Sequence, residues 1–135
     1  MAFINWDSSL SVNVGEIDQQ HKKLVGMINE LDDAMRQGKG KDVLGKIIND
    51  LNAYTATHFK TEEDYFGRFA YPETVSHKKE HVYFVQKTSE IRNGFANGKL
   101  ALSIDVMDFL GKWLKDHIMG TDKKYSKFLN EKGLK

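Results

Sequence analysis

The chain has 135 residues, of which 40% are hydrophobic and 29% charged, as in an ordinary single-domain globular protein. Its net charge of +1 supplies no basic surface for a nucleic acid or an anionic membrane, so we expect neither as a partner. Because the sequence contains no cysteine, disulfides, thiolate nucleophiles and iron–sulfur clusters are excluded. Any metal must therefore bind to nitrogen and oxygen ligands.

The amino-terminal residues, MAFINWDSS, precede the first helical pattern. They contain neither the basic start nor the apolar run of a targeting signal, and no later stretch approaches the roughly 20 apolar residues of a membrane span. The sequence therefore predicts a cytoplasmic protein. We expect Phe3, Ile4 and Trp6 to form an arm that packs across the fold, rather than an exposed aromatic binding patch.

Two amphipathic helices are predicted in the first half of the chain. Apolar residues recur every three or four positions over residues 17–35 and again over 44–69. Between them, the GKGK of residues 38–41 resembles a phosphate-binding loop only in composition, and we expect a plain turn. The second pattern ends just before Pro72, the only proline. Three ionisable side chains lie on these apolar faces: His21, His58 and Glu62.

Two further helices are predicted in the second half. The third pattern covers residues 77–95 and ends at an Asn-Gly pair, and Ser103 is placed to cap the start of a fourth helix. The fourth apolar face extends to about Ile118, and the lysine-rich tail is expected to form a short fifth helix capped by Thr121 or Asp122. The histidines on these two faces are His77, His81 and His117.

Four amphipathic helices with short connectors predict an all-α fold, an antiparallel up-down-up-down four-helix bundle with an N-terminal arm and a short C-terminal helix. We expect residues 1–135 to form one domain. In this domain the arm would comprise residues 1–16, the bundle 17–119, and the tail with its short helix 120–135.

All five histidines fall on the inward faces of the predicted helices. A single histidine on an apolar face is usually a hydrogen-bonded core residue, but five together are hard to explain in that way. Burying them without partners would cost about 1–3 kcal/mol each, so the core must contain something that satisfies them together. A metal centre is the simplest such group.

The segment HFKTEEDYF, residues 58–66, offers three acidic neighbours to one histidine. Glu62 follows His58 by four positions and therefore lies one helical turn away, about 40° around the axis. Glu63 and Asp64 are turned about 140° and 240° from His58, so we expect both to be solvent-exposed surface charges. Glu62 is the predicted metal ligand.

His77 and His81 have the same four-residue spacing and can bind one ion from a single helical face. Glu80 lies off that face and the HExxH order of a zinc protease is absent. His117 and Asp122 are five positions apart, which would splay them by about 140° in a regular helix. We therefore expect the helix to end or loosen at the glycine between them, which would turn Asp122 back toward the core.

Five imidazoles and two carboxylates are too many donors for one ion of any common coordination number, so two ions fit better. If both ions are about six-coordinate, and both carboxylates and one oxo or hydroxo group bridge them, one coordination position is left over. This position belongs to the ion with two histidines, where a small external ligand could bind.

The pattern resembles that of the hemerythrin family, specifically the bacterial hemerythrin-like domains. The resemblance runs from about Trp6 to about Asp122, and it extends to all seven ligand positions. The motifs that carry it are His21 in IDQQHKKL, His58 and Glu62 in HFKTEE, His77 and His81 in HKKEH, and His117 and Asp122 in HIMGTD.

The resemblance implies that the cofactor is a pair of non-haem iron ions. It places His77, His81 and His117 on one iron and His21 and His58 on the other, with Glu62, Asp122 and an oxo or hydroxo group as bridges. It also implies an apolar wall around an oxygen pocket, although each member of this wall could equally be ordinary core packing. The implied wall residues are Leu24, Phe59, Trp113, Leu114 and Ile118.

By the same resemblance, the partner is dioxygen and the function is its reversible binding for transport or storage, without catalysis. Two alternatives stay open. One is an oxygen- or redox-sensing domain that works with a signalling domain outside this chain. The other, less favoured, is a di-iron peroxidase or a nitric oxide-handling protein.

Overall fold

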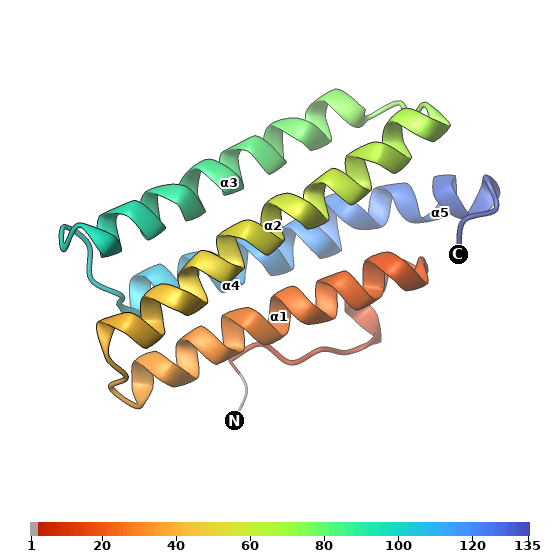
Figure 1. The fold of residues 1–135 in the computed structure, drawn as a ribbon. Helices are drawn as coiled ribbons and strands as arrows, with labels where there is room; N and C mark the ends of the chain where they lie inside the picture. The colour runs from red at the N-terminus through yellow and green to blue at the C-terminus, as the bar shows by residue number, and fades with distance from the viewer. Residues whose placement is uncertain (1–2) are drawn as a thin grey trace.

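The computed structural model describes residues 3–135, and this part of the chain contains helices and no strand. Its four long helices form an antiparallel up-down-up-down bundle, which confirms the predicted fold class (Figure 1). Within residues 3–135, no helix combines the length and the apolar character needed to cross a membrane. The bundle helices are α1 (Gly15–Arg36), α2 (Lys41–Phe69), α3 (Thr74–Ala96) and α4 (Ile104–Asp116).

Short connectors with defined end signals separate the helices. Gly38 has a φ of 71°, so the GKGK segment is a tight turn as expected, and Gly98 has a φ of 72° in the turn after α3. Ala70 takes the left-handed conformation at the end of α2, and its amide donates to the Phe66 carbonyl. Ser103 accepts a hydrogen bond from an amide in the first turn of α4, which confirms it as the N-cap.

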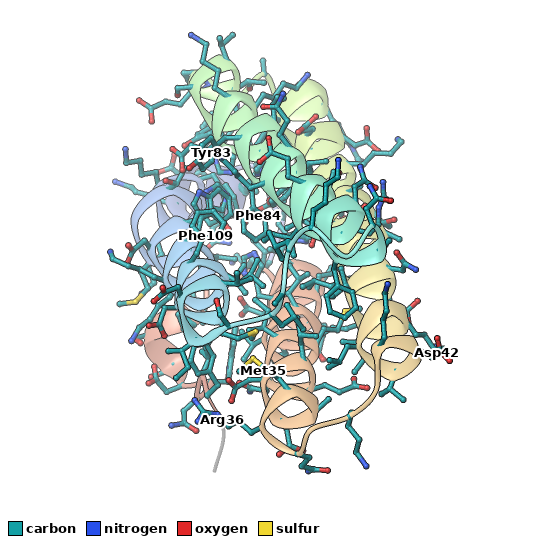
Figure 2. The ribbon with its side chains drawn as sticks, turned by 90° about the vertical axis from the view of Figure 1, so that its left-hand side faces the viewer. Met35, Arg36, Asp42, Tyr83, Phe84 and Phe109 are labelled. Carbon is teal, nitrogen blue, oxygen red and sulfur yellow. The ribbon has the colours of Figure 1, made fainter. Side chains whose placement is uncertain are left out.

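The four bundle helices pack against one another through different kinds of contact. Helix α2 packs closely against α1 and α3, and α1 packs against α4. Between α3 and α4, aromatic rings fill the space: Phe84 stacks on Trp113 with ring centroids 4.0 Å apart and lies 6.4 Å from Phe109. Figure 2 shows Phe84, Phe109 and Tyr83 gathered where the two helices face each other.

The arm lies alongside the bundle, in red in Figure 1, and includes a short 3-10 helix at Ser8–Leu10. Phe3, Ile4 and Trp6 are partly buried against the core, as expected, while the first two residues of the predicted arm lie outside the described residues. The backbone of Ile4 exchanges two hydrogen bonds with the Asn29 side chain, of 2.7 and 2.8 Å.

The last bundle helix does not stop at Gly120. It widens into a π-helical segment, His117–Asp122, and continues as α5 (Lys123–Glu131). A π-helical turn brings residues five positions apart onto one face, which is the spacing of His117 and Asp122. The expected loosening is therefore present, but the alternative role of Asp122 as a helix cap is not, since its side chain makes no capping hydrogen bond.

Candidate metal centre

Seven polar side chains converge in the interior of the bundle. Helices α1, α2 and α3 contribute five of them, and the π-helical segment that extends α4 contributes two. None is more than 3% exposed. All the residues predicted as metal ligands are thus brought together: His21, His58, Glu62, His77, His81, His117 and Asp122.

The donor atoms fall into two overlapping groups. Within each group, one nitrogen or carboxylate oxygen from every residue lies within 4.8 Å of all the others. One group contains three histidines and the other two, while both carboxylates belong to each. The first group is Glu62, His77, His81, His117 and Asp122, and the second is His21, His58, Glu62 and Asp122.

Asp122 faces the two groups with different oxygens. Its Oδ1 lies 2.8 Å from Nε2 of His77 and 3.0 Å from Nε2 of His117. Its Oδ2 lies 3.1 Å from Nε2 of His21. A carboxylate in this position can reach an ion in either group, because its two oxygens point toward histidines of both.

Glu62 also reaches both groups. Its Oε1 lies 3.3 Å from Nε2 of His58 and 3.2 Å from Nε2 of His81, and its Oε2 lies 3.9 Å from Nε2 of His21. The buried hydroxyl of Tyr125 donates a hydrogen bond to Oε2. Burial raises the pKa of Tyr125 well above its ordinary value, so the phenol stays protonated and holds the carboxylate in place.

Apart from Oε2 of Glu62, the donor atoms have no hydrogen-bond partner in the described part of the chain. The Nε2 atoms of all five histidines are buried without a hydrogen bond, as are Oε1 of Glu62 and both oxygens of Asp122. Several nitrogen and oxygen atoms of the site lie close together, as Nε2 of His77 and Oδ1 of Asp122 do at 2.8 Å, yet they do not form a hydrogen bond. Buried unpaired polar atoms cost about 1–3 kcal/mol each. Metal coordination would satisfy them together, so these residues fit a metal centre.

The protonation of the imidazoles also suits metal binding. Burial lowers the pKa of His58 and of His81 to about 4, so both rings are neutral at pH 7, the form that coordinates a metal. Burial disfavours the charged form of His117 too, but Asp122 and Glu80 outweigh it and raise the pKa of His117 to about 10. A bound cation would take the place of that proton.

Three acceptors fix the orientation of the rings by accepting a hydrogen bond from Nδ1, which leaves Nε2 free to face the centre. Each acceptor lies next to a predicted ligand in the sequence and reaches a histidine on the following helix. The contacts are His58 to Gln20 (2.6 Å), His81 to Glu63 (2.8 Å) and His117 to Glu80 (2.8 Å).

The prediction that Glu63 is only a solvent-exposed charge was therefore wrong. Its side chain is 29% exposed and contacts His81, whereas Asp64 is 67% exposed and pairs with Lys60, as expected of a surface residue. Glu80 does lie off the face of His77 and His81, but it contacts the next helix. Angles around a single helix axis do not reveal contacts that a side chain makes with the neighbouring helix, and Glu63 and Glu80 make such contacts. The only sign of these contacts in the sequence is that each acceptor stands next to a predicted ligand, in QH (20–21), EE (62–63) and EH (80–81).

A family comparison agrees with this geometry. Residues 12–129 match the family model described as the hemerythrin HHE cation binding domain. The chain belongs to the hemerythrin family. Membership implies non-haem iron binding, and the cluster of nitrogen and oxygen donors could hold such a metal.

Individual hemerythrins are similar over nearly the whole chain. A bacteriohemerythrin of Pseudomonas aeruginosa is 36% identical over 93% of this chain and 80% of its own length. A bacteriohemerythrin of Stenotrophomonas maltophilia is 32% identical over 93% of this chain and 81% of its own length. A hemerythrin-like protein of Naegleria gruberi is 36% identical over 90% of this chain and 89% of its own length. The crystal structure of a wild-type hemerythrin superposes with a TM-score of 0.89 at 31% identity, covering 93% of this chain and 97% of that one.

The residues of the expected oxygen pocket divide into two sets. Phe59 and Trp113 contact ligand rings directly: Phe59 stacks on His81 at 3.8 Å between centroids, and Trp113 stacks on His117 at 4.5 Å. The other three, all buried in the apolar core, are Leu24, Leu114 and Ile118. Their role in a pocket stays a prediction.

Removing the metal should destabilise the fold, because the donor atoms would be left buried and unpaired. Each ion bound at a hundredfold excess over its dissociation constant stabilises the fold by about 2.7 kcal/mol, which in a chain of this size corresponds to a midpoint shift on the order of 10 °C per ion. Thermal melts with and without chelator measure this shift. Equal midpoints would contradict a metal centre in the core.

Replacing one donor should release metal, and replacing a nearby surface charge should not. We expect His77→Ala to retain at least one ion fewer per chain than the parent protein, since a single face of α3 then loses half of its donors. Asp64→Ala is the control and should keep the full content. Metal analysis of purified protein makes the comparison, and equal loss from both variants would show that the donors are wrongly assigned.

Proposed function

We propose that the chain reversibly binds dioxygen at a di-iron centre. The observation that carries this proposal is the sharing of Glu62 and Asp122 between two groups of donors. One ion cannot use all seven side chains, whereas two ions bridged by the shared carboxylates can. The ligands would be His77, His81 and His117 for one iron and His21 and His58 for the other, with Glu62, Asp122 and an oxo or hydroxo group as bridges.

The unequal number of histidines supports an exchangeable ligand. With similar coordination numbers, the iron bound by His21 and His58 has one protein donor fewer than its neighbour. The free position would accept a small molecule as an external ligand. The ring of Phe59 stacks on His81 and also lies 5.7 Å from that of His58, and Trp113 stacks on His117.

The charge of the donor set supports binding rather than catalysis. Only two of the seven donors are carboxylates. Di-iron enzymes of the ferritin-like class use Glu-x-x-His pairs and further glutamates, which supply more negative charge for higher oxidation states. A buried centre with mostly nitrogen donors stabilises higher oxidation states less and excludes water. An apolar wall formed by Leu24, Leu114 and Ile118 would also slow the delivery of protons to a bound ligand.

An anaerobic optical titration tests the proposal. We expect the reduced, iron-loaded protein to gain a visible absorption band when oxygen is added and to lose it when oxygen is removed, over repeated cycles. Asp64→Ala should behave in the same way. Irreversible loss of this absorption band after the first exposure to oxygen would contradict reversible binding and favour sensing or catalysis. If two irons were bound and no oxygen-dependent band appeared, oxygen binding itself would be contradicted.

A further inference from the structure

The three acceptors behind the imidazoles differ in charge. In the three-histidine group, His81 and His117 donate from Nδ1 to the carboxylates of Glu63 and Glu80. In the two-histidine group, His58 donates instead to the neutral amide oxygen of Gln20. Two histidines of the three-histidine group therefore donate to negatively charged acceptors, whereas His58 of the two-histidine group donates to a neutral one.

This difference has an electronic consequence. An amide oxygen and a carboxylate both fix the tautomer and orientation of the ring. Only the carboxylate also carries charge, which strengthens the hydrogen bond and makes the imidazole a better electron donor to a metal on its other nitrogen. An ion bound through such rings is stabilised in its more positive state.

Neither carboxylate is paired with a lysine or an arginine among residues 3–135. The only basic side chain within ion-pair distance of Glu63 is His81, and that of Glu80 is His117. The hydroxyl of Thr121 also donates to both oxygens of Glu80, at 2.8 and 3.1 Å, and keeps it in place without adding charge.

The two carboxylates are partly open to solvent, which moderates their effect. The exposed fractions are 29% for Glu63 and 44% for Glu80. Glu63 also lines a groove of about 400 Å³ between α2 and α3, with His81 and Phe59 in its wall. Because both carboxylates are partly exposed, solvent screens their charge, and we expect a moderate rather than a large influence on the centre.

We propose that Glu63 and Glu80 are positioning residues that make the three-histidine iron the more easily oxidised of the two. Acting through His81 and His117, they stabilise the higher charge on that iron, while Gln20 orients His58 without doing so. The asymmetry keeps the more easily oxidised ion away from the open coordination position. This inference rests on the proposed di-iron centre and deepens it.

Substitutions that change charge but keep a hydrogen-bond acceptor test the proposal. Glu63→Gln and Glu80→Gln should each raise the midpoint potential of the iron-loaded protein, and Gln20→Glu should lower it. The expected change in the oxidised-to-reduced ratio at a fixed potential is about fivefold per substitution, the difference between a charged and a neutral hydrogen bond. Anaerobic spectroelectrochemistry measures the potentials, and Asp64→Asn, which removes an exposed neighbouring charge, should change them little.

A second measurement separates charge from orientation without using iron. In calorimetric titrations of the metal-free protein with cobalt(II), Glu63→Gln should bind nearly as tightly as the parent protein. Glu63→Ala, which removes the acceptor as well, should bind about 10- to 100-fold more weakly. Equal loss in both variants would mean that charge, not ring orientation, governs affinity, and would overturn the division of roles.

The outcomes distinguish this inference from the proposed function. Unchanged potentials in Glu63→Gln and Glu80→Gln, with two irons and a reversible oxygen band retained, would overturn the inference alone. An equal shift of the midpoint potential in Asp64→Asn would also overturn it, since the effect would then come from the loss of any nearby negative charge and not from the hydrogen bonds to the histidines. Shifted potentials in a protein without an oxygen-dependent band would leave the inference standing and overturn the proposed function.

Discussion

The structure depends on one constraint, which is that polar side chains buried in the bundle must coordinate something. Three carboxylate oxygens, namely Oε1 of Glu62 and both oxygens of Asp122, face the five Nε2 atoms in the core without hydrogen bonds. A folded domain of ordinary stability is held by about 5–15 kcal/mol, so that many unpaired buried atoms would consume much of it. Coordination to a metal would satisfy these atoms and connect all four helices, so that the fold and the site would stabilise each other.

The contacts behind the site extend this coupling from helix to helix. Each acceptor sits beside a ligand on its own helix and orients a histidine on the next, from α1 through α2 and α3 to the π-helical segment. A shift of one helix therefore moves both a ligand and the support of its neighbour's ligand. Tyr125 on α5 adds a further contact to the centre through Glu62, so the carboxyl-terminal helix also contributes to its geometry.

Helical periodicity was enough to predict the bundle and to predict that the donors face its interior. The four-residue spacings of His58 with Glu62 and of His77 with His81 require only a regular helix. Asp122 was harder, because its five-residue spacing indicated a distortion without specifying a π-helical turn. The outer acceptors, Gln20, Glu63 and Glu80, could not be assigned from angles on one helix, since their partners are set by how neighbouring helices are rotated and packed.

The central claim is that the seven side chains hold two ions between them. Anomalous X-ray diffraction at the iron edge, from crystals of the iron-loaded protein, tests it most directly. The account predicts two peaks about 3.5–4 Å apart, one beside the three-histidine group, the other beside the two-histidine group, and both next to Glu62 and Asp122. A single peak among these residues, or iron located elsewhere in the molecule, would contradict it.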